Sequence, residues 1–282
     1  MKQIIAGVAI LVICGACNNK KANIDPFASI TNEVDSRRNK IDSVFKKDRI
    51  DEPLPVEEDE SFDDFVYRFA SDDTLQRQRI VFPLSFYNED KKMSIEKRFW
   101  KHDDLFVKQG YYTLLFDSEK DMELVEDTAL NKVKVEFTYL KTRMMKTYLF
   151  QRNRGVWMLQ QIKLSNINKS EEDNFLDFFE SFATDSLFQS HHVREPLNFV
   201  TTDPDDDFSI LETTLDLNQW FAFKPTLPTD FLFNINYGQQ NQPGSSVKII
   251  ALKGIGNGFS NILYFQRKDE TWELYKFEDT SI

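Results

Sequence analysis

Two stretches of the chain place apolar side chains at the spacing of one helix face, and each is followed by residues that alternate between apolar and polar. In the first stretch the apolar residues stand at i, i+3, i+4 and i+7: Phe62, Phe65, Val66 and Phe69. This spacing predicts a helix with one buried aromatic stripe. Ser71-Asp72-Asp73 interrupts the pattern and can cap a second short helix, which we expect to end at Pro83.

The pattern that follows has a period of two residues, which is typical of strands with one buried face. It covers four runs: Tyr111 to Phe116, Val133 to Tyr139, Thr147 to Arg152 and Val156 to Leu164. Asn153-Arg154-Gly155 is a short hairpin connection between the last two runs. These runs predict an antiparallel meander that is buried on one face and solvated on the other.

The same order of residues occurs twice. At a constant offset of 113 residues, Phe62, Phe65, Phe69, Asp72, Gln76, Pro83, Leu84 and Phe86 correspond to Phe175, Phe178, Phe182, Asp185, Gln189, Pro196, Leu197 and Phe199. At an offset of 115, Phe150-Gln151-Arg152 with Trp157 and Leu159 correspond to Phe265-Gln266-Arg267 with Trp272 and Leu274. Trp100 and Trp220 each stand 12 residues before an equivalent strand residue, Tyr112 and Leu232. Such spacing predicts two copies of one unit.

The second stretch predicts the same elements. Ser170 and Asp173 form a capping box before the helix, and Pro196 ends the helical part. The strands expected after it are 230–236, 247–252, 261–267 and 271–277. We therefore predict an α+β fold of two tandem repeats, 61–165 and 170–282, each with short N-terminal helices packed on a curved antiparallel sheet of about four strands.

The N-terminus has the pattern of an export signal. A positive start, Met1-Lys2-Gln3, precedes an apolar run from Ile4 to Ile13, which is too short to span a bilayer. Gly15-Ala16-Cys17 resembles the lipobox of bacterial lipoproteins, whose cysteine is lipidated. We expect a signal peptide over 1–16, a lipid on Cys17 and, because Asn18 is not the inner-membrane retention aspartate, the outer membrane. The alternative is a soluble secreted protein cleaved near Ala16.

Residues 17–60 are polar and charged, and they predict a tether that holds the globular part away from the bilayer. Within this segment, 25–46 has helical spacing after Asp25-Pro26, which supply an N-cap and an N1 proline. It is either a docking helix or an amphipathic stretch of a solvated linker.

Composition narrows the chemistry. After Cys17 the chain has no cysteine, which excludes a disulfide, a thiolate nucleophile and a cysteine-ligated metal. The net charge of -11 opposes binding to nucleic acid and to anionic lipid head groups, so the acyl chains would be the membrane contact. The chain is rich in aromatic residues, with 26 Phe, enough for one large core or two small ones.

Candidate chemistry is sparse, and we expect no catalytic residue, metal or cofactor. His102 lies in a charged stretch, and adjacent His191 and His192 cannot ligate one metal at the usual i, i+4 spacing. The acidic cluster 203–207 has Phe208 and Thr214 where a calcium loop needs Gly and Glu. The G-x-G-x-G run of 254–258 is not followed by a helix, so a wide hairpin explains it better than a phosphate loop.

The polar and Trp residues that recur in both copies are the remaining candidates for a site. They either line a pocket or serve folding, with aspartates that cap the second helix and arginines that clamp strand ends, and we favour the folding role. The set is Asp72, Asp185, Gln151, Arg152, Gln266, Arg267, Trp100 and Trp220.

This order of elements resembles the nuclear transport factor 2-like (SnoaL-like, cystatin-like) cone. The duplicated form behind a lipobox is similar to an uncharacterised family of bacterial lipoproteins. The resemblance covers residues 61–280 and implies a sheet wrapped over helices with an apolar hollow between them. The wider fold includes isomerases, dehydratases, and binding and scaffold domains, so the resemblance lends no activity.

Three classes of function are therefore open. The first is an envelope lipoprotein whose duplicated, non-catalytic domain binds a small apolar ligand, a peptide or another envelope protein. The second is an enzyme of the isomerase or dehydratase kind, which needs a Tyr, Asp or His with a shifted pKa in an apolar cavity. The third is a structural scaffold with filled hollows and an exposed apolar patch for a partner.

Overall fold

The structure is a computed structural model that describes residues 61–127, 129–167, 173–203, 205–240, 242 and 244–282. The predicted signal peptide over 1–16, Cys17, the tether to residue 60 with its helix over 25–46, and the predicted cap Ser170 lie outside the described residues. Among the described residues, no helix combines the length and the apolar character that crossing a bilayer requires.

Short helices alternate with long strands. The α-helices are α2 (Phe62–Ser71), α3 (Asp73–Gln78), α4 (Asp173–Thr184), α5 (Ser186–His191) and α6 (Leu217–Phe223), and the 3-10 helices are η1 (Lys97–Phe99) and η2 (Glu119–Glu126). The first six strands are β1 (Ile80–Asn88), β2 (Lys91–Ile95), β3 (Tyr111–Phe116), β4 (Lys132–Tyr139), β5 (Met144–Asn153) and β6 (Val156–Asn166). The others are β7 (Val193–Asp203), β8 (Asp206–Leu215), β9 (Phe231–Asn236), β10 (Val247–Gly254), β11 (Ser260–Lys268) and β12 (Thr271–Asp279).

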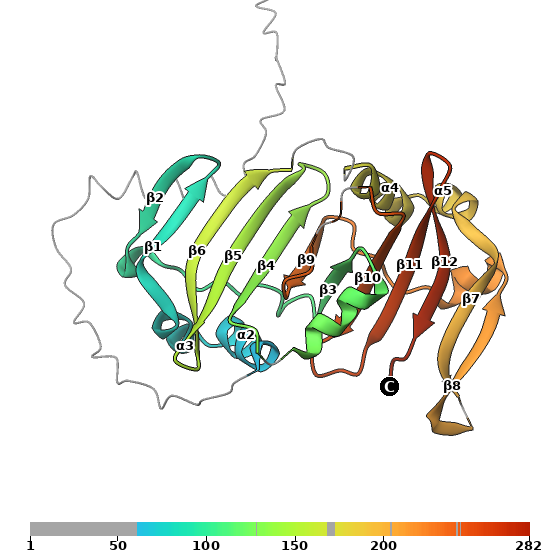
Figure 1. Cartoon of the computed structure of the whole chain (residues 1–282), viewed down its shortest axis with the longest axis horizontal. Coiled ribbons are helices and arrows are strands. Elements are labelled where there is room, and N and C mark those ends of the chain that lie inside the picture. Colours follow the sequence, from blue (N-terminus) through green and yellow to red (C-terminus); the bar gives the residue numbers. More distant parts are fainter. Residues whose placement is uncertain (1–60, 128, 168–172, 204, 241, 243) are drawn as a thin grey trace, which may run out of the picture. The chain divides into compact units, whose positions relative to one another are not determined.

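The described strands form one sheet of twelve, in the order β2-β1-β6-β5-β4-β9-β3-β10-β11-β12-β7-β8 (Figure 1). The predicted fold class, two tandem repeats with a sheet of about four strands each, is therefore wrong. Alternation shows which side chains of a strand share a face, but it does not say which strand lies beside which.

The two central strands are exchanged between the halves. β3 comes from the first stretch but pairs with β10 of the second, and β9 comes from the second stretch but pairs with β4 of the first. β3 and β9 run parallel to each other and are joined by a single register pair, Thr113 with Asn234. Neither predicted repeat thus completes a sheet from its own strands.

The meanders β4-β5-β6 and β10-β11-β12 are antiparallel, as the alternation predicted. The helices, however, end at Gln78 and His191, so the prediction that Pro83 and Pro196 end them is wrong. Both prolines lie inside strands, β1 and β7, where the parallel pairing to β6 and β12 is irregular. Proline is tolerated there because an irregular position does not require its missing N–H.

The two helix pairs pack on opposite faces of the sheet. The ring of Phe150 contacts α2 through Phe62, Phe65 and Phe69, and the ring of Phe265 contacts α4 through Phe175, Phe178 and Phe182. Register pairs place Val133 on the face of Phe150 and Lys248 on the face of Phe265. Between them, consecutive residues Asn234 and Ile235 point to opposite faces, with Ile235 on the Phe150 face. Each half of the sheet thus has its own aromatic core.

Candidate functional site

A pocket of about 600 Å³ lies at the centre of the sheet, on the face that carries Phe265. Its lining comes from β3, β4, β5, β9 and β10, from the segments that follow β3, β6 and β9, and from Phe175 and Leu176 of α4. The pocket therefore stands where the two halves of the sheet meet.

The exchange of β3 and β9 explains why a pocket forms there. The two strands share one register pair, Thr113 with Asn234, so beyond it they are not laddered to each other. The lining residues Asp117 and Asn236 stand at the carboxyl ends of these parallel strands. In open α/β sheets, ligands bind in the crevice outside the carboxyl ends of the parallel strands.

Asn234 joins the three strands that surround this crevice. Its side-chain Oδ1 accepts a hydrogen bond from the backbone N–H of Leu115 on β3 at 3.0 Å, and its Nδ2 donates to Glu136 Oε2 on β4 at 3.0 Å. The residue is only 3% exposed. A buried amide destabilises the fold unless its hydrogen bonds are made, so these contacts fix the side chain of Asn234 between β3 and β4.

Glu136 is the carboxyl group at the floor of the pocket. Burial raises its pKa above the ordinary value of 4.5, although hydrogen bonds from Asn234 and Asn236 and the charge of Lys134 oppose the shift. The group is therefore easier to protonate than an ordinary glutamate. It can accept a hydrogen bond as a carboxylate or donate one as an acid.

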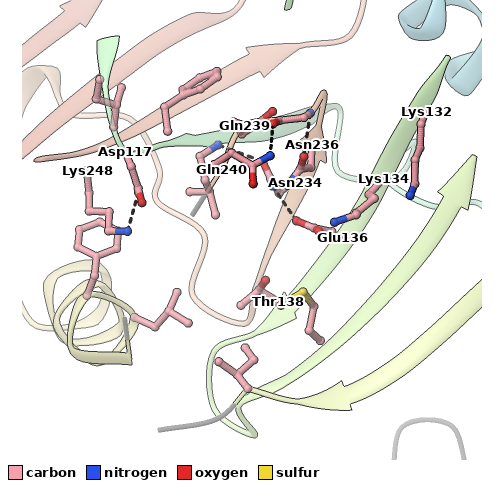
Figure 2. Close-up of a pocket in the computed structure, with 18 residues that line it drawn as sticks. Asp117, Lys132, Lys134, Glu136, Thr138, Asn234, Asn236, Gln239, Gln240 and Lys248 are labelled. Atoms are coloured by element: carbon pink, nitrogen blue, oxygen red, sulfur yellow. Dashed lines mark hydrogen bonds and ion pairs between the residues drawn. The ribbon is translucent and has the colours of Figure 1, made fainter. Parts of the chain in front are cut away.

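Charged groups stand on both sides of the floor (Figure 2). On one side, Lys248 Nζ lies 2.6 Å from Asp117 Oδ1, and both side chains are largely buried. On the other side, Lys132 and Lys134 of β4 are exposed at the rim. The rim therefore offers positive charge to a ligand above a floor of amides and one acid.

The remaining wall is apolar. It is formed by side chains of β3, β5, α4 and the segment after β6: Leu115, Met145, Ile167, Phe175 and Leu176. A pocket with a mixed lining of this kind fits a ligand that has both a polar and an apolar part.

The sequence-predicted candidates do not line this pocket. Asp72 and Asp185 are exposed and cap α3 and α5, each by accepting two backbone N–H bonds on one carboxylate oxygen, at 2.8 and 3.1 Å. Each aspartate therefore stabilises the start of the second helix of its pair.

Trp100 and Trp220 are buried beside these bends. Trp100 Nε1 donates to Gln76 Oε1 at 2.9 Å, and Trp220 Nε1 donates to Gln189 Oε1 at 3.3 Å. Each glutamine in turn donates to a carbonyl of the preceding helix, at Phe69 and Phe182. These hydrogen bonds therefore tie each tryptophan to the bend between two helices.

The strand-end candidates are scattered. Gln151 and Arg267 are exposed, and Gln266 donates to Glu273 at 3.3 Å. Arg152 lies over the ring of Trp157 and lines a second, smaller cavity of about 360 Å³. Of the eight candidates, Arg152 alone lines one of these two cavities.

This second cavity holds Asp63 at the start of α2 and Tyr237 after β9. The Tyr237 hydroxyl donates to Asp63 Oδ1, and burial raises the pKa of Asp63 above its ordinary value, against the effect of this bond. Burial also raises the pKa of Tyr237. Phe62 and Trp157 provide aromatic walls.

The remaining sequence candidates lie apart. His102 Nδ1 is 3.5 Å from Asp104 Oδ1, and His192 stacks on Phe188 at 4.0 Å between ring centroids. The acidic cluster forms the β7–β8 turn, where Asp203 pairs with Asp206. In the part of the chain that the structure describes, no three His, Cys, Asp or Glu side chains gather as metal ligands.

Sequence reasoning missed Glu136, Asn234 and Asn236. A signal was present, because asparagine is rare inside strands and β9 carries two in the apolar run FLFNIN. The polar positions of β4 alternate with Val133, Val135 and Phe137, so they were interpreted as a solvated face. Only the neighbouring strand shows that they border a pocket.

Comparisons with known proteins agree with an NTF2-like fold. A protein family described as a domain of unknown function (DUF4348) matches residues 41–279. The crystal structure of an NTF2-like protein from Bacteroides fragilis is 68% identical in sequence, with a TM-score of 0.78 over 82% of this chain and 100% of that one. No curated protein matches the chain.

Proposed function

The chain belongs to the DUF4348 family and has an NTF2-like fold, and from this premise we propose that it is a non-catalytic binding protein whose central pocket holds a small ligand. The ligand has an anionic or strongly polar head and an apolar portion. NTF2-like domains serve as binding modules and as isomerase-like enzymes, so the site must decide between these functions.

The proposal rests on one observation: the pocket of about 600 Å³ has a floor of polar side chains that are hydrogen-bonded to each other, and an apolar wall. Asn234 and Glu136 are held by contacts from three strands, so a ligand meets preformed partners. Lys132 and Lys134 at the rim favour an anionic head. Phe175 and Leu176 of α4 favour an apolar tail.

The test is native mass spectrometry of the protein purified from its own membrane, followed by extraction of any retained small molecule. We expect a bound species in the wild type and its loss in Lys134→Glu. Lys163→Glu is the matched control, because Lys163 is exposed on β6, on the same face, but outside the pocket. No retained species, or equal loss in both variants, would count against the pocket.

A second candidate function is supported by the smaller cavity. Asp63, with its raised pKa and its bond from Tyr237, is an acid–base pair in an aromatic hollow, as an isomerase or dehydratase needs. We rank it below binding because the cavity is smaller, and because Arg152 is the one cationic group among the described residues of its lining, where Glu126 and Asp127 add negative charge. Turnover of a ketone or hydroxy-acid library that Asp63→Asn abolishes would reverse the ranking.

We propose that the chain is attached to the cell envelope, in the outer membrane, through a lipid on Cys17. The support is the sequence pattern of an export signal that ends in Gly15-Ala16-Cys17. Labelling of cells with a radioactive fatty acid should mark the wild type in the membrane fraction, and Cys17→Ser should lose the label. Labelled Cys17→Ser protein would refute the assignment.

We also propose that the two helix-and-strand sets arose by duplication. The caps at Asp72 and Asp185 and the bonds of Trp100 and Trp220 to paired glutamines support this origin, because unrelated segments need not share both. Superposition of α2–β6 on α4–β12, with β3 matched to β9, tests it. A poor fit of the paired caps would argue for independent origins.

A further inference from the structure

The two edges of the sheet are built differently. β2 at one edge has five residues and carries exposed Lys91 and Lys92. β8 at the other edge has ten residues, DDFSILETTL, and its neighbour in the sheet is β7 alone. Short length, charged side chains (lysine above all) and proline are among the devices that stop an edge from pairing with another chain. β2 is short and carries lysines, whereas β8 is long, has neither lysine nor proline, and carries acidic residues as its charged side chains.

β8 also exposes apolar side chains on both faces. Ile210 is 66% exposed on one face and Leu211 is 41% exposed on the other. On the face of Leu211, the partly exposed ring of Phe223 stacks on Phe199 of β7 at 6.3 Å. An added strand would therefore gain backbone hydrogen bonds and apolar contacts on both sides.

The negative charge around the β8 edge determines which kind of strand can bind there. Residues 195–223 contain seven acidic residues and no lysine or arginine. In the described part of the edge, Asp205, Asp206, Glu212 and Asp216 are all exposed. If a second copy paired through β8, acids would gather on both strands, and like charges on paired strands are destabilising. A cationic strand would instead gain electrostatic attraction.

We propose that β8 binds an extended segment of a partner protein, rich in Lys or Arg alternating with apolar residues, which adds to the sheet as a thirteenth strand. The backbone edge provides affinity, Ile210 and Leu211 contact the apolar positions, and the acids select basic ones. This surface is separate from the central pocket, so a partner protein and a small ligand can bind together.

The probe is a synthetic peptide of about ten residues that alternates Lys and Val, added to the full-length protein in detergent. Its controls are the Glu–Val peptide and a Lys–Val peptide N-methylated at alternate residues, which cannot complete a strand ladder. We expect saturable binding of the first peptide alone. Hydrogen exchange should slow at the backbone amides of 206–215.

The variant is Ile210→Lys, which puts a lysine on the edge and should weaken binding of the Lys–Val peptide about tenfold or more. Leu187→Lys on α5 is the matched control, because Leu187 is equally exposed, at 68%, and belongs to a helix rather than to the edge strand. Absence of saturable binding, equal binding of the N-methylated peptide, or a dimer that Ile210→Lys dissociates would each overturn the proposal.

Discussion

At the scale of single residues, buried polar side chains supply hydrogen bonds where the strands β3 and β9 are not paired along their length. Asn234 supplies Leu115 N–H with an acceptor and Glu136 with a donor, where β3 and β9 share only one register pair. The pairing of a buried amide with a partly buried acid makes the site polar and gives both groups a hydrogen-bond partner. Because Glu136 belongs to this network, its protonation state affects the stability of the folded protein.

Glu136→Gln should raise the melting temperature at neutral pH, because burial disfavours the charged carboxylate. The pKa of Glu136 is raised on folding, so its stabilising contribution is complete below the unfolded value near 4.5 and is lost as pH rises through the folded value. The gain from the amide should thus be small near pH 4 and grow toward about pH 7. Calorimetry across this range tests the prediction.

The exposed change Glu212→Gln on β8 is the control for this experiment. A gain from Glu136→Gln that stays constant with pH, or a loss at neutral pH, would show that burial does not govern this carboxyl group.

Asp185→Ala should lower stability by about 0.5–2 kcal/mol, because α5 loses the side chain that caps two backbone N–H groups. Asp72→Ala should do the same at the matched cap of α3. Thermal denaturation measures the effect. Because neither cap lines the pocket, retention of ligand should be unchanged, and lost binding at unchanged stability would reassign these residues to a site.

At the scale of elements, the sequence predicted most strands but not their neighbours. The segments 111–116, 133–139 and 156–164, which have a period of two residues, form β3, β4 and β6. The sequence did not predict β1 and β7, because Pro83 and Pro196 are typical of the end of a regular element. Both prolines lie inside strands, at irregular positions of the parallel pairs β1–β6 and β7–β12. The exchange of β3 with β9 could not be predicted, because each strand buries the same kind of face beside either partner.

The candidate site was unpredictable for the same reason. Folding roles for Asp72 and Asp185 followed from local capping chemistry, which needs only residues two or three positions away. The pocket instead depends on Glu136 and Asn234, which are 98 residues apart and meet through strand pairing. Local sequence patterns therefore predict helix caps, but they do not predict contacts between strands that are far apart in the chain.

Asn234→Val should destabilise the protein by about 1–3 kcal/mol, because Leu115 N–H and Glu136 lose their partner. The substitution introduces a residue with higher strand propensity than asparagine, so a loss of stability reflects the hydrogen bonds and not the strand propensity. Urea denaturation provides the measurement. Asn198→Val in β7 is the matched control, since Asn198 is exposed in a strand, and an equal effect of both changes would contradict the role given to Asn234.

At the scale of the whole molecule, the described strands form one sheet whose halves depend on each other. Each half borrows its innermost strand, β3 or β9, from the other stretch of the chain. The aromatic cores on opposite faces are separate, but the sheet that supports them is continuous. The pocket is a product of this continuity, because both stretches line it.

A fragment of residues 61–165 should therefore fail to fold alone, since β4 would lack β9 and β3 would lack both neighbours. Its amide NMR spectrum should be poorly dispersed, and co-expression with 173–282 should restore dispersion. A fragment that folds cooperatively by itself would show that the exchange of strands is not needed for stability.

Hydrogen exchange on the protein with its native ligand retained, and again after the ligand has been extracted, tests the central claim most directly. We expect faster exchange after extraction at 115–117, 132–138 and 234–240, the segments that line the pocket between the two halves of the sheet. Unchanged exchange there, with the difference confined to 61–63 and 125–127 beside the smaller cavity, would contradict it.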